Sequence, residues 1–159
     1  MTRHGILFAV LCAAILGGCR EAGKSGVALR LDEGGKLERR ALSFPDGTTI
    51  QAEVAETPGS REMGLMFRTR LDPDYGMLFI FPQSQPQMFW MKNTFVDLDM
   101  IFLDEEKRVT VVHHDVPRSS PGQSDETVAR RAGVGRYVLE LPSGSARKLG
   151  LKVGDTLRF

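Results

Sequence analysis

Apolar and acidic side chains alternate from Thr94 onward, within the most hydrophobic stretch of the chain. Because successive side chains of a strand point to opposite faces, Asp97 and Asp99 would lie on one face and a run of apolar residues on the other. The residues on that apolar face are Val96, Leu98, Met100 and Phe102. Ile101 and Leu103 complete the aspartate face, so the pattern predicts a strand that is buried on both sides at its far end.

Two segments have the pattern of a β-hairpin, in which two strands flank a turn. Residues 41–44 are followed by Pro-Asp-Gly-Thr at 45–48 and by alternating apolar positions at 50–54. Residues 95–114 contain a polar turn at 104–107 between two apolar runs. Both patterns predict antiparallel hairpins.

Further strands are predicted where short apolar runs are bounded by polar or Pro-rich segments. These runs cover residues 76–81, 137–141 and 156–159, and the loops are expected at 68–75, 82–87 and 116–127. The chain has no internal repeat and no alternation of strands with long helices. We therefore predict a mainly β fold, a compact β-barrel or sandwich-like domain with one or two short helices.

The first of these helices is expected to begin at Thr57, which can cap it and is followed by a proline suited to the first helical position. Its end is predicted near Phe67, and the helical spacing of Met63, Met66 and Phe67 predicts that they face the core. Gly64 interrupts the helix at a cost of about 1 kcal/mol against alanine, so we expect it to allow close backbone packing.

The second helix is expected near the C-terminus. Ser143 can cap a helix that extends to Leu149, with Gly150 as its C-terminal stop. A turn at 153–155 then leads into the last predicted strand.

The first 19 residues have the features of a cleaved export signal. Arg3 and His4 precede an apolar run at 6–16 that is too short to span a bilayer. The run ends in Leu-Gly-Gly-Cys, which resembles the lipobox of bacterial lipoproteins and predicts that Cys19 is lipidated. The alternative is an ordinary signal peptide with a chance cysteine. Several acyl chains at Cys19 would anchor the mature protein stably to a membrane.

The remainder of the chain divides into a tether and one domain. Residues 20–38 are rich in Gly, Lys, Glu and Ala, which predicts a flexible tether, although a weak first strand at 27–31 is the alternative. Residues 39–159 then form a single β-rich domain, since 42% apolar and 26% charged residues is an ordinary globular composition.

Charge and cysteine content exclude several classes of function. The formal net charge is +1, so no global field favours nucleic acid, and we expect no nucleic-acid partner. Cys12 falls in the removed segment and Cys19 would be modified. The mature domain therefore has no thiol for a disulfide, a thiolate metal site or a cysteine nucleophile.

Five blocks of the chain resemble, in order, those of the bacterial and archaeal DUF192 family. They are GLMFR at 64–68, GMLFIF at 76–81, FWMKNT at 89–94, LDMIFLD at 98–104, and YVLELPSG at 137–144 followed by GLKVGD at 150–155. The resemblance spans residues 53–158 and implies a compact β-rich domain, often exported, with no established biochemical function. The family usually has proline where this chain has Asp97, which places a second carboxylate beside Asp99.

Five polar or aromatic residues near the central strand are candidates for ligand contact. Trp90 has polar neighbours in Lys92 and Asn93, which suits stacking on a sugar ring or on a partner's surface, although a lone tryptophan also suits a core. Asn93, Asp97 and Asp99 are separated by even intervals, which would align their oxygens for a hard cation or a sugar if the strand is regular. The Lys-Asn-Thr step can break that register, and Asp99 can instead bond the backbone in a turn.

Two chemical hypotheses compete with simple binding. Paired carboxylates at Asp97 and Asp99 could act as acid and base in a hydrolase or lyase of envelope saccharides. Six methionines between Met63 and Met100 could bind Cu(I), or they could simply fill an irregular core. His113 and His114 are adjacent, so on a strand they face opposite sides and cannot readily chelate one ion together.

No serine-histidine, zinc or phosphate-loop signature supports catalysis, and we expect no cofactor and no metal site. The sequence thus favours a non-catalytic domain that is anchored to the bacterial cell envelope through Cys19 and faces the periplasm. We expect it to bind a small ligand, such as a saccharide, or a protein partner. The ligand-binding residues predicted are Trp90, Lys92, Asn93, Asp97 and Asp99.

Overall fold

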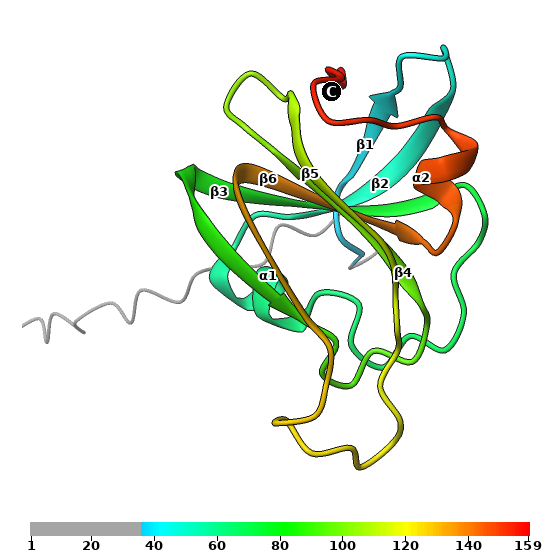
Figure 1. Cartoon of the computed structure of the whole chain (residues 1–159), viewed down its shortest axis with the longest axis vertical. Helices are drawn as coiled ribbons and strands as arrows, with labels where there is room; N and C mark the ends of the chain where they lie inside the picture. Colours follow the sequence, from blue (N-terminus) through cyan, green and yellow to red (C-terminus); the bar gives the residue numbers. More distant parts are fainter. Residues whose placement is uncertain (1–35) are drawn as a thin grey trace, which may run out of the picture.

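Six strands and two short helices form the part of the chain that the computed structural model describes, residues 36–159 (Figure 1). The predicted signal peptide, Cys19 and nearly all of the predicted tether lie outside these residues. The elements are β1 (Arg39–Ser43), β2 (Thr49–Ala55), α1 (Pro58–Met63), β3 (Tyr75–Trp90), β4 (Leu98–Leu103), β5 (Val109–Val116), β6 (Arg130–Pro142) and α2 (Ser145–Lys148). The prediction of a mainly β fold with two short helices is therefore confirmed. No helix in the described part of the chain is long and apolar enough to cross a membrane.

The strands form one mixed sheet in the order β1-β2-β3-β6-β4-β5. Neighbouring strands are antiparallel except β2 and β3, which are parallel and are connected through α1. The two predicted hairpins are the β1-β2 and β4-β5 pairs. The sheet is not closed into a barrel, so the barrel form of the prediction is wrong.

The predicted last strand at 156–159 is also wrong. This segment makes only isolated bridges, from Arg158 to Ser43 in β1 and from Thr156 to Arg108 just before β5. Its hydrogen bonds are divided between these two sites, because the Arg158 amide donates to Ser43 and the Leu157 amide donates to Lys107. The C-terminal segment thus contacts the chain at both edge strands, β1 and β5, but it does not pair with either as a further strand.

The sheet is buried on both faces, and each face has its own apolar cluster. All six residues of β4 are buried, and its five apolar residues are divided between the two clusters. One cluster receives Leu98, Met100 and Phe102, and the other receives Ile101 and Leu103. The prediction that the far end of this segment is a strand buried on both sides is confirmed, although the strand begins at Leu98 and not at Thr94.

Strand β3 is much longer than the predicted run at 76–81. It continues to Trp90 and pairs with β6 on both sides of a register break between Ile80 and Gln85. The loop predicted at 82–87 is therefore wrong. Pro82 falls within the break, where no ladder amide is required, so a proline is accommodated there without ending the strand.

Helix α1 ends at Met63, earlier than predicted, because the chain leaves it at Gly64. Thr57 caps the helix as expected and forms a reciprocal capping box with Ser60. Gly64 has φ 45° and ψ −130°, a conformation that is open essentially to glycine alone. The turn directs Leu65 into the core, whereas Met63 is 55% and Phe67 61% exposed, so the prediction that these two face the core is wrong.

Helix α2 is capped by Gly144 in the left-handed region and not by Ser143, which corrects the prediction. The Ser143 hydroxyl instead contacts Asp115 of β5. Ala146 of α2 packs in one apolar cluster, and Leu65, just after α1, packs in the other. The two helices accordingly lie on different sides of the sheet (Figure 1).

Candidate ligand-binding site

Trp90 is the last residue of β3 and lies at the surface, with 39% of its area exposed. The Lys92 ammonium lies 4.9 Å from the centre of a Trp90 ring, and the Arg130 guanidinium lies 5.8 Å from it. Lys92 also forms a 2.6 Å ion pair with Asp125, which belongs to the loop before β6. The indole thus lies among charged side chains at the surface. The alternative, that Trp90 is a core residue, is wrong.

A surface groove of about 330 Å³ lies beside this indole. We call it the Trp90 groove, and its lining residues are Gly59, Glu62, Met63, Met66, Trp90 and Lys92. Helix α1 and the turn after it form one wall, and the end of β3 forms the other. The groove therefore exists because α1 ends early, which leaves Met63 exposed and Met66 half-buried beside the indole.

A smaller cavity of about 40 Å³ shares five of these lining residues and extends inward toward the sheet. We call it the Glu140 pocket. Its further lining residues are Arg61, Gly64, Leu65, Phe79, Phe89, Thr94 and Glu140. The groove and the pocket are lined together by three aromatic rings, two thioethers and several polar groups. These residues surround a path from the surface to a buried carboxyl.

Glu140 is a functional candidate that the sequence reasoning missed. It lies on β6 opposite Met77 of β3 and Met100 of β4, and it is only 4% exposed. Burial raises the pKa of its carboxyl from an ordinary 4.5 to about 8. A signal was present in the sequence, because Glu140 interrupts an apolar strand between Leu139 and Leu141.

The Lys-Asn-Thr step ends β3 with a turn, and this turn breaks the alignment expected for Asn93, Asp97 and Asp99. Asn93 has φ 52°, and its carbonyl accepts the Phe67 amide. Asp97 is exposed before β4 begins, and its carboxylate accepts the Arg118 amide at 2.8 Å. The structure therefore brings Trp90 and Lys92 together but does not align Asn93, Asp97 and Asp99 on one regular strand.

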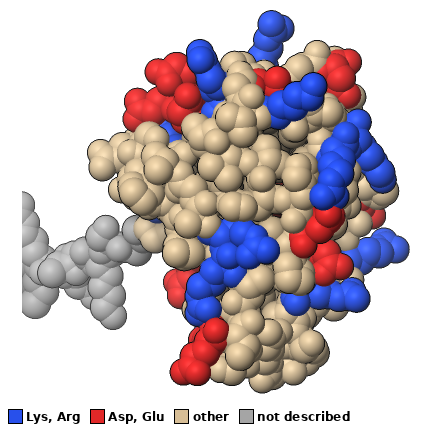
Figure 2. Space-filling model, viewed as in Figure 1, with Lys and Arg blue, Asp and Glu red and all other residues tan. Residues whose placement is uncertain are grey.

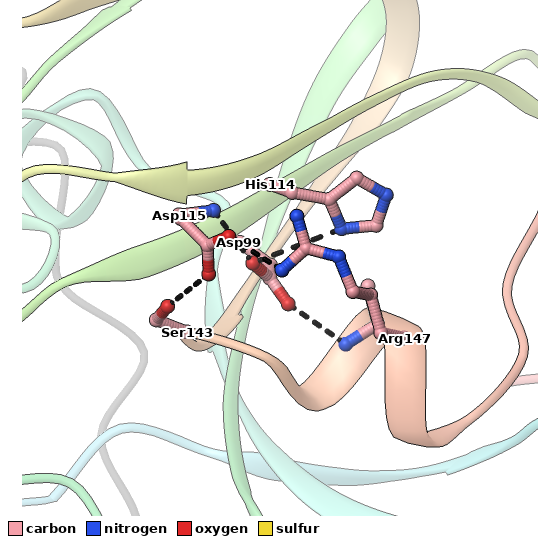
Figure 3. Close-up of polar contacts among 6 residues, drawn as sticks. Asp99, His114, Asp115, Ser143 and Arg147 are labelled. Carbon is pink, nitrogen blue, oxygen red and sulfur yellow. Dashed lines mark hydrogen bonds and ion pairs between the residues drawn. The ribbon is translucent and has the colours of Figure 1, made fainter.

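Asp99 is fully buried, and backbone amides occupy both of its carboxylate oxygens (Figure 3). One oxygen accepts the Asp115 amide at 3.0 Å, and the other accepts the Ala146 amide at 2.8 Å. The second bond satisfies one of the free amides at the start of α2, which lacks a side-chain cap of its own. Asp99 pairs in register with Leu141, so it lies on the sheet face opposite Glu140.

Charged groups surround Asp99 without giving it access to solvent (Figure 3). His114 Nδ1 lies 4.0 Å from Asp99 and has no hydrogen-bond partner within residues 36–159. Asp115 bonds Ser143 and Arg147, and these two contacts hold the pKa of its carboxyl below the usual range. These contacts connect β4, β5 and α2, and they stabilise the fold where the three elements meet.

No group of three or more His, Cys, Asp or Glu side chains in the described part of the chain is arranged to hold a metal ion. On the face drawn in Figure 2, Lys and Arg are interspersed with Asp and Glu, and a broad band of other residues crosses between them. This face therefore presents no extended surface of one sign.

These features define a mainly β, single-sheet domain with a surface groove beside an aromatic residue and a buried carboxyl below it. The chain belongs to the DUF192 family (Uncharacterized ACR), whose profile matches residues 41–159. The comparison with curated proteins gives no match.

Two solved structures are similar to this chain. One, from Sinorhizobium meliloti 1021, carries a description that suggests a transcription regulator; it is 37% identical over 76% of this chain and 92% of its own, with a TM-score of 0.65. The second is a protein of unknown function from Novosphingobium aromaticivorans DSM 12444. It is 31% identical over 84% of this chain and 94% of its own, with a TM-score of 0.68.

Proposed function

We propose that this protein is a non-catalytic, lipid-anchored domain of the bacterial cell envelope that faces the periplasm and binds a small ligand in the Trp90 groove. The observation that carries the proposal is the exposed indole of Trp90, oriented beside Lys92 at the edge of a groove of about 330 Å³. The apolar run and Cys19 at the N-terminus supply the argument for export and anchoring.

The chemistry of the groove favours an uncharged polar ligand with one apolar face, such as a saccharide. An aromatic ring can stack on the apolar face of such a ligand, while the surrounding polar groups can bond its hydroxyls. The groove itself holds one acidic residue, Glu62, and one basic residue, Lys92. Charges of both signs suit a neutral ligand better than an ion.

A protein partner is the second candidate, and a specific observation favours it. Met63, Phe67, Met88 and Trp90 are all large apolar residues with 39% or more of their area exposed. Exposed apolar residues of this size are typical of surfaces that bind other proteins. Titration with a saccharide fraction and with a polypeptide fraction separates the two candidates.

Saccharide cleavage, copper binding and nucleic-acid binding have less support from the geometry. Asp99 has no exposed oxygen to offer a saccharide in a reaction shared with Asp97. Met77, Met91 and Met100 are fully buried, and the Trp90 groove is lined by two methionines and no histidine. The regulator description of the Sinorhizobium protein would imply nucleic-acid binding, which a formal net charge of +1 does not favour.

Because Trp90 is the only tryptophan, intrinsic fluorescence reports on the groove directly. We expect a saturable change in Trp90 emission when the purified protein is titrated with a neutral saccharide fraction of its own envelope. Lys92→Ala should weaken this response, whereas Lys152→Ala, at an exposed lysine far along the chain, should leave it unchanged. A response only to a polypeptide fraction would favour a protein partner, and a response only to Cu(I) would favour copper binding.

A further inference from the structure

Glu140 differs from the other buried glutamate of the sheet in having no partner. Glu53 is 6% exposed and accepts bonds from Arg68 at 2.8 Å and from the Tyr75 hydroxyl at 3.0 Å. The Glu140 side chain makes no hydrogen bond or ion pair with any residue of the described segment 36–159, and burial alone shifts its pKa. Its register neighbours on both sides are methionines, which cannot compensate a carboxyl.

An unpartnered carboxyl is costly at this position. Burying a polar group without a hydrogen bond costs about 1 to 3 kcal/mol by mutational measures, and an apolar residue would avoid that cost. The carboxyl is also not sealed off, because it lines the Glu140 pocket, which is continuous through shared residues with the Trp90 groove. A partner for Glu140 can therefore come from outside the protein.

The dimensions of the pocket restrict that partner to one small group. A cavity volume of about 40 Å³ is a few times the roughly 10 to 15 Å³ that a cavity needs to hold one water molecule. Phe79, Phe89 and Leu65 give the pocket apolar walls. Glu140 and Thr94 are the buried polar residues that line it. Three charged residues line the pocket as well. Arg61 and Glu62 belong to α1, and Lys92 belongs to the turn after β3.

We infer that the Glu140 pocket is a subsite that receives one uncharged hydroxyl or amide group of the ligand bound in the Trp90 groove. This inference rests on the proposed function and adds to it the chemical class of the group that is recognised. A protonated carboxyl can donate one hydrogen bond and accept another, so a hydroxyl or a primary amide satisfies both of its oxygens. Burial favours that protonated form at neutral pH.

The test uses small probes that fit the pocket alone, read by the ¹³C signal of the Glu140 side-chain carboxyl in the full mature chain. Methanol and acetamide should shift this signal saturably at pH 6.5, while acetate and methylammonium should not. Saturable binding of methylammonium in place of the neutral probes would identify an ion-pairing site and overturn the inference. Absence of any saturable shift with all four probes would overturn it as well.

Two variants connect the pocket to the groove. Glu140→Gln retains a donor and an acceptor and should bind the envelope ligand within about threefold of wild type, whereas Glu140→Leu should weaken binding about tenfold, the equivalent of one neutral hydrogen bond. Both should fold, because neither breaks an existing contact. If Lys92→Ala weakens binding and Glu140→Leu does not, the subsite is refuted while the proposed function stands; if neither does, both are refuted.

Discussion

Asp99 and Glu140 are acidic residues buried on opposite faces of the same sheet, and they have opposite surroundings. Two backbone amides bond Asp99, one from β5 and one from α2, whereas Glu140 faces a cavity. Asp99 thus stabilises the fold, whereas Glu140 is part of a candidate binding site. Their sequence contexts are alike, since each interrupts an apolar strand.

The role of Asp99 predicts a loss of stability on Asp99→Asn. The amide group of asparagine can accept only one of the two backbone amides, so the other loses its partner inside the protein. We expect a loss of about 1 to 3 kcal/mol in the free energy of unfolding, measured by urea denaturation. Asp97→Asn is the matched control and should change the stability little, because Asp97 is exposed and its oxygen acceptor is retained. Equal stability of the two variants would show that the Asp99 bonds contribute nothing.

The surroundings of Glu140 predict a pH dependence of stability. Because its folded-state pKa of about 8 lies above the ordinary 4.5, the folded protein holds a proton that the unfolded chain releases between these values. Its stabilising contribution is full below pH 4.5 and is lost as the pH rises through about 8, at about 1.4 kcal/mol per pH unit. Glu140→Gln should therefore gain stability relative to wild type as the pH rises from 5 to 8.

Urea denaturation of both proteins at several pH values measures this difference directly. Glu62→Gln, at an exposed position in the same groove, is the control and should follow wild type at every pH. A constant difference between Glu140→Gln and wild type from pH 5 to 8 would mean that the carboxyl ionises normally in the folded state.

At the scale of elements, β4 also packs against a part of β6 with which it does not pair. A Cβ atom added at Gly133 of β6 would lie 2.5 Å from the ring of Phe102 in β4, closer than any allowed contact. Phe102 is fully buried and also packs edge-on against Phe89 of β3. The aromatic ring therefore occupies the space that a larger residue at Gly133 would need.

This contact predicts a coupling between two substitutions. Phe102→Ala should cost about 3 to 5 kcal/mol, and Gly133→Ala about 1 to 3 kcal/mol through overpacking. In the Phe102→Ala background the added methyl has free space, so the cost of Gly133→Ala should largely disappear. Chemical denaturation of the single and double variants measures the coupling, with Val134→Ala, at an exposed neighbour, as the control. Additive effects would show that Phe102 and Gly133 do not share this space.

The sequence predicted those elements whose local pattern agrees with their tertiary setting. Strand β4 and the two hairpins follow directly from alternation and turn residues. The length of β3 could not be predicted in this way, because pairing with β6 sustains a strand through a register break that contains Pro82. The early end of α1 depends on the conformation of Gly64. The helical spacing of the methionines instead predicted that the helix continues to Phe67.

The candidate site was predicted only in part for a similar reason. Trp90 and Lys92 are close in sequence and meet in one groove, so local reasoning sufficed for them. Glu140 reaches the same region through the pairing of β6 with β3, a long-range contact that alternation cannot reveal. Alternation in the sequence predicts that Asp97 and Asp99 lie on one face of a strand. Because the chain turns at 91–94 and β4 begins only at Leu98, Asp97 lies outside the strand.

For the whole molecule, a folded domain is joined to a predicted anchor at Cys19. Wild type should fractionate with membranes and carry a lipid-modified N-terminus, since two or more acyl chains bind a bilayer stably. Cys19→Ser should be released to the soluble fraction or fail to be processed. Fractionation and mass spectrometry of the mature N-terminus measure this, and a soluble wild type with an unmodified N-terminus would refute the anchor.

Binding in the Trp90 groove is the central claim, and native mass spectrometry of the protein purified from its own envelope tests it most directly. We predict that wild type carries a bound small molecule, that Trp90→Ala loses it while retaining the fold, and that Lys152→Ala keeps it. Circular dichroism of each variant establishes that the fold is retained. Equal occupancy of the bound molecule in wild type and in folded Trp90→Ala would contradict binding in this groove.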